Sequence, residues 1–193
     1  MKPISVLFAL AALVFAGATS DKSVGDPNAP VKIDIFSDFQ CPSCKKLHDQ
    51  TIPDLINYEV NKGRVLLVYH DFPLPQHAHA REAAKWANAA AQVHKYRAVG
   101  DALFRTQAAW EANGDLRSAV ASALTPAEMK TVEALMKDPK FDDGIAKDVA
   151  LGTQAGLRET PTMILTHKLQ TYPFSGFISY YILKPAIDDI AKK

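Results

Sequence analysis

The two cysteines of the chain are Cys41 and Cys44, and the residues between them are Pro42 and Ser43. Two thiols at this spacing can form a reversible disulfide, or they can supply part of a metal site, so the spacing alone is ambiguous. A disulfide between them would close a loop too short to stabilise a fold, because the stabilisation grows with loop length. We therefore interpret the pair as a candidate redox centre and not as a structural crosslink.

The segments on either side of the pair predict where each sulfur lies. Residues 31–36 alternate between apolar and polar side chains, which is typical of a strand with one buried face. A helix is predicted to begin near Pro42, since proline is tolerated in a first turn. Cys41 would lie just before this helix, where free N–H groups and the helix dipole favour a thiolate. We assign Cys41 as the nucleophile, Cys44 as the resolving thiol, and Pro42 with Ser43 as the active-site turn.

A second candidate element lies far along the chain, at Thr160 and Pro161, directly before the strand-like run 162–166. A proline at the head of a strand can follow a cis peptide bond, although most bonds before proline are trans. A cis bond would turn the backbone of Thr160 outward, where it could pair with an extended peptide by strand addition. A trans proline that only begins the strand is the alternative, and the upstream pair of thiols favours a cis Pro161 with Thr160 and Pro161 as substrate-binding residues.

Length and charge limit the classes of function. The chain has 193 residues and is 48% hydrophobic, which is enough to bury the core of one domain. Its formal net charge of +1 provides no basic surface for nucleic acid, and no nucleic-acid partner is predicted. Recognition must therefore be sought in the chemistry of particular residues.

The N-terminus has the pattern of an export signal. Lys2 precedes an apolar run over residues 4–15, and Ala16 to Ala18 are the small residues that a signal peptidase recognises. The run is shorter than the roughly 18–20 residues that cross a bilayer. We predict a signal peptide over residues 1–18, a polar lead-in over 19–30, and a periplasmic or secreted location, where disulfides persist.

The remaining pattern predicts one α/β domain over residues 31–193. Strands are predicted at 31–36, 65–69, 162–166 and 169–172; helices follow Pro42 and span 80–98, 101–110 and 115–124, with others capped by Thr125, beginning at Asp138, and spanning 179–191 with an interruption at Pro185. Without the helical block of about 77–156, the order is βαβ followed by ββα. This is the thioredoxin fold with a helical insertion between its two halves.

Five short strings carry a resemblance to a known family. Residues 36–44 read FSDFQCPSC and residues 156–162 read GLRETPT, while residues 71–74 read DFPL, residues 77–81 read HAHAR, and residues 102–104 read ALF and are followed by Gln107. In these strings the chain resembles the DsbA-like family of exported thiol:disulfide oxidoreductases. The resemblance implies a redox-active Cys41–Cys44 disulfide with no other cofactor, and a cis Pro161.

The resemblance also implies partners. The expected substrates are unfolded or cysteine-containing exported proteins. The expected redox partner lies in the membrane and is a DsbB-like or quinone-linked oxidase, or else a reductase. The protein itself is expected to be a monomer.

The chain departs from the family at one position. Members often have a glutamate six residues before the first cysteine, where it can handle the proton of the resolving thiol, and this chain has Ile35. Asp34 is adjacent, but successive strand residues point to opposite faces. The proton of Cys44 is therefore left without an assigned acceptor, with Asp38 and water as candidates.

Histidines near the pair could suggest a zinc site instead. We predict that His77 and His79 face solvent at the start of a helix, that His48 is a solvated helix residue, and that the chain binds no metal.

Three functions are compatible with these residues. The first is an oxidant that donates the Cys41–Cys44 disulfide to folding proteins. The second is a disulfide reductase or isomerase, which Thr160 before Pro161 mildly favours, although residues 19–30 are too few for the dimerisation module that an isomerase usually needs. The third is a non-catalytic module that binds extended peptides, and the intact pair of thiols argues against it.

Overall fold

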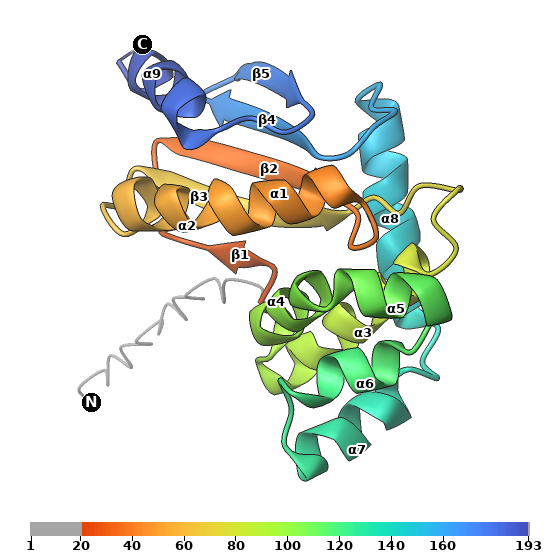
Figure 1. Cartoon of the computed structure of the whole chain (residues 1–193). Coiled ribbons are helices and arrows are strands. Elements are labelled where there is room, and N and C mark those ends of the chain that lie inside the picture. Colours follow the sequence, from red (N-terminus) through yellow and green to blue (C-terminus); the bar gives the residue numbers. More distant parts are fainter. Residues whose placement is uncertain (1–20, 193) are drawn as a thin grey trace, which may run out of the picture.

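The structure is a computed structural model that describes residues 21–192, built around a five-stranded mixed sheet. The strands are β1 (Ser23–Val24), β2 (Val31–Ser37), β3 (Val65–Asp71), β4 (Thr162–His167) and β5 (Gln170–Ser175). Their order across the sheet is β1-β3-β2-β4-β5, with β2 and β3 parallel and every other pair antiparallel. The C-terminal end of the central strand β2 leads through a short loop, residues 38–41, into helix α1 (Figure 1).

One face of the sheet is covered by the helices that flank the cysteine motif and by the last helix. These are α1 (Pro42–Gln50), α2 (Ile52–Leu55) with the π-helical turn Ile56–Val60, and α9 (Tyr180–Ile190). The alternation in β2 turns Ile33 and Ile35 toward this face, where both are buried. They pack with apolar residues of these helices, among them Leu47, Leu55 and Leu183.

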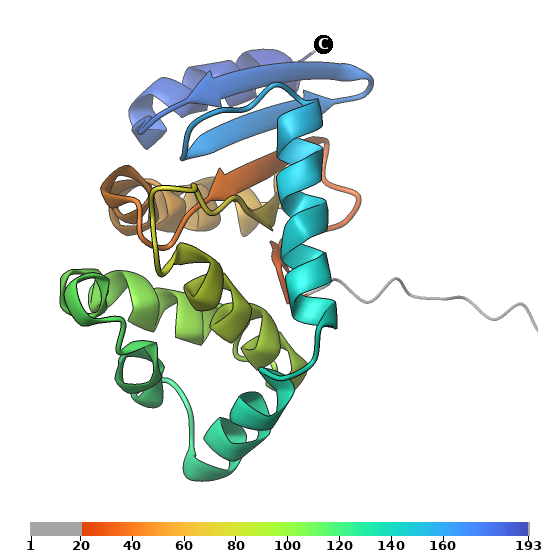
Figure 2. The ribbon, with the colours of Figure 1, turned by 90° about the vertical axis from the view of Figure 1, so that its right-hand side faces the viewer.

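The other face of the sheet is covered by α8 (Lys140–Gln154), which stands across the strands in Figure 2. A Cβ atom at Gly152 would lie 2.6 Å from the ring of Phe72, so glycine allows the helix to approach the sheet. Burial lowers the pKa of His70, but hydrogen bonds to Asp148 (3.0 Å) and Asp34 (2.9 Å) outweigh it and raise that pKa to about 9. A charged imidazole therefore joins β2, β3 and α8.

The other helices of the insertion gather on one side of the sheet, below it in both Figure 1 and Figure 2. They are α3 (Ala80–Ala90), the 3-10 turn Ala91–Val93, α4 (Tyr96–Arg105), α5 (Gln107–Asn113), α6 (Leu116–Ala121) and α7 (Pro126–Leu135). They enclose a second buried cluster, which includes Trp110 and Leu103 and also contains Cys41 and Cys44. The predicted fold class, a thioredoxin fold with a helical insertion between its βαβ and ββα halves, is confirmed.

The predicted continuous helix over residues 80–98 is wrong. His94 takes the left-handed conformation with φ 57°, its N–H donates to the Ala91 carbonyl, and the N–H of Lys95 donates to the Ala90 carbonyl. These are the two bonds of a Schellman helix end, here formed without glycine. The high helix propensity of alanine hides this end, because the turn depends on how α3 and α4 pack against each other.

The next predicted helices have the wrong bounds. The chain turns at Thr106 between α4 and α5, and the Thr106 hydroxyl donates to the Ala102 carbonyl at 2.8 Å, a bond that competes with the helical pattern. The helix predicted over residues 115–124 is the shorter α6. The predicted cap at Thr125 is confirmed, because its side chain accepts from the Glu128 N–H and the Glu128 carboxylate accepts from the Thr125 N–H.

Two further differences lie near the ends of the described chain. Within the predicted lead-in, Ser23 and Val24 form β1 and pair with β3, and α9 continues through Pro185, where an interruption was predicted. The predicted signal peptide, residues 1–18, lies outside the described residues. Among residues 21–192, no helix is long and apolar enough to cross a membrane.

Candidate active site

Cys41 is the residue that immediately precedes α1, and its backbone is extended while Pro42 occupies the first turn. No side chain caps the helix, so the N–H groups of the first turn are available to the Cys41 sulfur. Cys44 follows one turn later and is 1% exposed, compared with 7% for Cys41. The two residues are free thiols in this structure.

The surroundings drive the acidities of the two thiols apart. The pKa of Cys41 is lowered to about 5, and the largest cause is a hydrogen bond from the Cys44 side chain. Thr160 and the N–H groups of Cys44 and Ser43 lower the pKa further, whereas burial opposes them. Burial raises the pKa of Cys44 well above its ordinary value, as do the hydrogen bond and the negative charge of Cys41. The Ser37 side chain and the Asp38 N–H, which lies 3.4 Å from the Cys44 sulfur, act in the opposite direction. Near neutral pH the pair therefore carries one thiolate, at Cys41.

Thr160 and Pro161 lie beside this thiolate although they are far away in sequence. The peptide bond between them is cis, and the Thr160 carbonyl oxygen lies 3.4 Å from the Cys41 sulfur. Both residues are buried, and the Pro161 carbonyl accepts a hydrogen bond from the Gly176 N–H at 2.8 Å. The structure thus brings the two predicted elements together, while their roles in binding substrate stay a prediction.

The loop before Cys41 is held by a buried carboxylate. Asp38 accepts hydrogen bonds from the N–H groups of Gln40 (2.7 Å) and Leu74 (2.8 Å), and its Oδ2 lies 2.7 Å from His77 Nδ1. The Asp38 side chain is fully buried, and the His77 side chain is mostly buried. The prediction that His77 faces solvent is wrong, because it assumed that the helix start at residue 77 lay apart from the cysteine motif.

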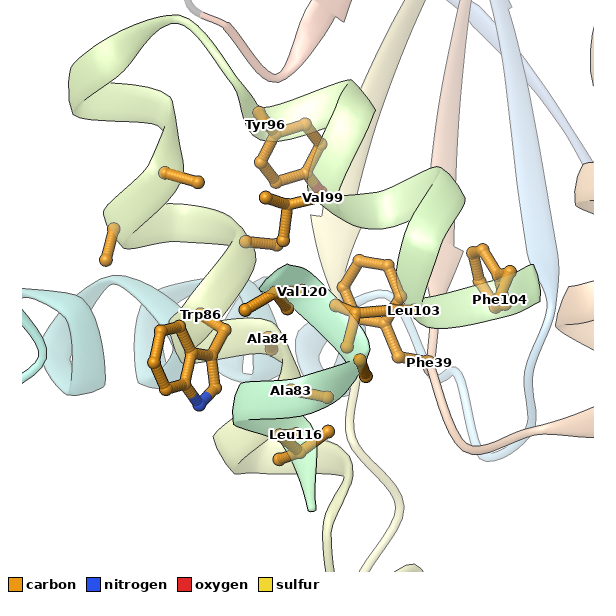
Figure 3. Packing of buried hydrophobic residues seen from close by; sticks show 14 of the residues in the cluster. Phe39, Ala83, Ala84, Trp86, Tyr96, Val99, Leu103, Phe104, Leu116 and Val120 are labelled. Atoms are coloured by element: carbon orange, nitrogen blue, oxygen red, sulfur yellow. The ribbon is translucent and has the colours of Figure 1, made fainter. Parts of the chain in front are cut away.

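The helical insertion holds the same loop from its other side. The side-chain amide of Gln107 donates to the carbonyl oxygens of Phe39 (2.7 Å) and Cys41 (3.2 Å). The Phe39 ring stacks at a tilt against Phe104, with ring centroids 5.0 Å apart, and Figure 3 shows its side chain within the buried cluster of the helices. From the sequence, Gln107 was noted only as part of the resemblance to the family and was given no role at the site. Its neighbours along the chain include other polar residues, so the local pattern did not single it out.

The predicted orientations in β2 agree with the structure. Ile35 is buried on the α1 face, and the Asp34 carboxylate bonds His70 and Lys32 away from the cysteines. His48, predicted to be solvated, is instead partly buried, and its Nε2 lies 3.1 Å from Asp101 Oδ1. This difference reflects the position of α4, which the pattern of α1 alone does not reveal.

The described residues contain no group of three or more His, Cys, Asp or Glu side chains that could hold a metal ion. His77 turns to Asp38, and the His79 ring lies against Gly114, where an added Cβ would come within 2.8 Å of it. Neither histidine joins the cysteines. The donor set of a zinc site is therefore not assembled by these side chains.

The difference in acidity predicts how alkylation depends on pH. The reduced protein should react with iodoacetamide at Cys41 alone, and the rate should rise with a midpoint near pH 5, because the thiolate is the reactive form. Because the pKa of Cys41 is lower in the folded protein than in the unfolded chain, the thiolate also stabilises the reduced fold. This stabilisation is complete above the unfolded pKa of about 8.5 and is lost as the pH falls through 5. Peptide mapping by mass spectrometry locates the label. Labelling of Cys44 at neutral pH, or a midpoint near that of a free thiol, would contradict the geometry.

Comparisons with known proteins agree with the architecture. The family model described as Thioredoxin matches residues 18–184. Among solved structures, alpha-DsbA1 from Wolbachia pipientis has a TM-score of 0.74 and 21% identity, with 90% of this chain and 96% of that chain covered. BdbD from Bacillus subtilis, in its oxidised form, has a TM-score of 0.71 and 25% identity, with 89% and 93% covered.

Curated relatives carry names that refer to disulfide formation. Disulfide bond formation protein D of Bacillus subtilis is 24% identical over 174 residues, which cover 86% of this chain and 74% of that protein. Probable disulfide bond formation protein D of Bacillus cereus is 38% identical over 60 residues, which cover 31% of this chain. The match spans only 27% of the length of that relative.

Proposed function

Because this chain belongs to the thioredoxin family, we propose that it is an exported thiol:disulfide oxidoreductase that donates a Cys41–Cys44 disulfide to substrate proteins. The names of the relatives in Bacillus, which refer to disulfide bond formation, support this proposal. The predicted signal peptide supports a periplasmic or secreted location. The substrates would be exported proteins that still contain reduced cysteines.

The observation that carries the direction of the reaction is the stabilised thiolate at Cys41. When the disulfide is reduced, Cys41 is released as a thiolate, so each contact that lowers its pKa favours the reduced form. A disulfide whose reduced form is stabilised is a strong oxidant. The contacts around Cys41 therefore favour an oxidant over a reductase.

The proposed reaction transfers two electrons from substrate to the pair. A substrate thiolate attacks the Cys41 sulfur, the bond between Cys41 and Cys44 breaks, and the electron pair passes to Cys44, which takes up a proton. A second substrate thiolate then attacks the substrate sulfur of the mixed disulfide, and Cys41 leaves as a thiolate. The substrate gains a disulfide, and the protein becomes a dithiol.

Thr160 and Pro161 would guide the substrate in this reaction. The Thr160 carbonyl oxygen is close to the Cys41 sulfur, so a peptide backbone lying along Thr160 would present its cysteine to Cys41. Reoxidation of the dithiol requires an acceptor, which we assign to a membrane oxidase that carries a disulfide or a quinone. The chain would act as a monomer.

The reduction potential of the pair tests the direction. After equilibration with glutathione buffers, we expect the Cys41–Cys44 pair to have a reduction potential of about −120 mV, the value of a strong oxidant. The oxidised protein should also oxidise a peptide with two cysteines. The redox state is read by acid quenching, alkylation and mass spectrometry. A potential near about −270 mV, the value of a reductant, would replace the proposal by the reductase alternative.

A further inference from the structure

Cys44 must exchange a proton in each half of the reaction, yet its sulfur is buried. The residue is 1% exposed, and Ile35 occupies the strand position beside it where an acidic group could act. Asp38 is not suited to this task, because its carboxylate already bonds the N–H groups of Gln40 and Leu74 and the ring of His77. A route between the Cys44 sulfur and solvent must therefore run through other groups.

A cavity of about 50 Å³ borders the Cys44 side chain. Its lining is mostly apolar and includes Ile35, but Ser37, His48 and Asp101 also line it and can form hydrogen bonds with water. Roughly 10–15 Å³ of such space is enough for one water molecule. The cavity is therefore large enough for a short chain of water molecules with polar partners along it.

The cavity borders an open depression on the surface. His48, Ile52, Arg97 and Asp101 line both spaces, so these four side chains form the wall between them. The depression is otherwise lined by residues of α1, α2 and the π-helical turn. A proton that crosses this wall passes from the surroundings of Cys44 to bulk water.

The wall contains a histidine in a defined position. His48 lies one turn after Cys44 on α1, and its Nε2 lies 3.1 Å from Asp101 Oδ1 on α4. The imidazole also stacks against Phe104, with ring centroids 4.6 Å apart. The side chain of His48 is 25% exposed and that of Asp101 is 52% exposed. The pair is thus held firmly while it keeps access to solvent.

We propose that His48, oriented by Asp101, relays the proton of Cys44 between the cavity and bulk solvent. The inference rests on the proposed function, because only a thiol exchange reaction requires Cys44 to gain and lose a proton. An imidazole suits a relay, since it accepts a proton on one nitrogen and releases one from the other near neutral pH. His48 acts on the proton of Cys44 through the cavity and does not contact the substrate.

The other ionisable groups that face the cavity are less suited. Burial raises the pKa values of Tyr69 and Tyr96, that of Tyr69 to about 12. Both nitrogens of His70 are held by carboxylates, and Asp71 accepts from a lysine and an asparagine. The guanidinium of Arg97 is a hydrogen-bond donor only and offers no site that accepts a proton. The imidazole at the wall is therefore the group that can exchange a proton with both sides.

The relay can be isolated in the reaction with glutathione disulfide. The Cys41 thiolate attacks this oxidant, forms a mixed disulfide and releases one glutathione thiolate. Cys44 then loses its proton through the cavity and attacks the Cys41 sulfur, which forms the Cys41–Cys44 bond and expels the second glutathione as a thiolate. The lifetime of the mixed disulfide therefore reports the deprotonation of Cys44, while its formation reports the chemistry of Cys41.

The test compares His48→Gln and Asp101→Asn with two controls, His94→Gln on an exposed histidine and Asp49→Asn, which changes the open depression but not the cavity. Each reduced protein is mixed with glutathione disulfide from pH 5 to 10, quenched with acid and weighed by mass spectrometry. At pH 7 we expect His48→Gln to prolong the mixed disulfide about 100-fold, the scale of general acid–base catalysis, and Asp101→Asn to prolong it less. The controls should match the unmodified protein.

The dependence on pH separates a relay from a structural effect. The difference caused by His48→Gln should shrink as the pH rises, because hydroxide can then remove the proton directly. An unchanged lifetime, or a lifetime prolonged by the same factor at every pH, would overturn the relay. If no mixed disulfide forms on Cys41 in the unmodified protein, the proposed function itself fails, and the relay fails with it.

Discussion

Replacing Cys41 by serine is expected to abolish the oxidation of a peptide with two cysteines, with a loss on the order of 10³-fold or more. A serine hydroxyl neither forms a disulfide nor ionises near neutral pH, and Cys44 is too deeply buried to take over the attack. Cys44→Ser should have a different outcome. Its Cys41 remains beside the first turn of α1, so it should attack a substrate disulfide, expel one substrate thiolate and be recovered in a mixed disulfide, because no Cys44 thiol is present to displace the substrate.

A matched control for these variants is Ser43→Ala, which changes the active-site turn but keeps both sulfurs. It should retain peptide oxidation, and its mixed disulfides should stay short-lived. Non-reducing electrophoresis and mass spectrometry follow the trapped species. Full activity in both Cys41→Ser and Cys44→Ser would eliminate the exchange mechanism, and peptide binding that persists without turnover would support the non-catalytic alternative.

Local patterns in the sequence were sufficient to predict the parts of the site that lie next to each other along the chain. The strand that ends at Ser37, the helix that begins at Pro42 and the strand after Pro161 each have a clear apolar period and a proline at a meaningful position. In the fold that these elements form, the antiparallel pairing of β2 with β4 brings Thr160 to Cys41. The prediction of these elements does not depend on contacts between distant parts of the chain.

The contacts made by the helical insertion could not be predicted in the same way. Gln107 and Asp101 lie more than 50 residues after the cysteines, and their contacts with the loop and with His48 depend on how α4 and α5 pack. Alanine-rich helices have few side chains that specify such packing, and the helix end at His94 was missed for the same reason. The insertion is thus the part of the chain where function depends most on tertiary structure.

Both cysteines belong to the buried cluster of the insertion, while the cluster between the sheet and α1 includes Leu47 of the same helix, and each cluster has a separate task at the site. The cluster between the sheet and α1 fixes the start of the helix, which determines where the Cys41 sulfur lies. The cluster of the insertion holds the backbone of the preceding loop through Phe39 and Gln107. Because the loop is held from both sides, the Cys41 sulfur stays close to the N–H groups that stabilise its thiolate.

The second large effect is expected from Asp38→Ala. Removing this carboxylate leaves the N–H groups of Gln40 and Leu74 and the ring of His77 without their buried acceptor, so we expect a loss of about 3–5 kcal/mol in the free energy of unfolding. Urea unfolding of the reduced protein measures this loss. Asp49→Ala is the matched control, because its carboxylate is exposed and pairs with Lys45 of the same helix, and it should change stability by less than about 1 kcal/mol.

The same variant also tests whether the loop controls the reactivity of Cys41. If Asp38 holds the loop in register with α1, its removal should raise the midpoint of Cys41 alkylation from near pH 5 toward that of a free thiol, because the N–H groups of the first turn no longer face the sulfur consistently. Asp38→Asn keeps one oxygen acceptor but places an NH2 donor against the N–H group of Gln40 or Leu74, so it should restore only part of both effects. A destabilised Asp38→Ala protein with an unchanged alkylation midpoint would show that α1 alone sets the thiolate, and that the carboxylate serves only the stability of the fold.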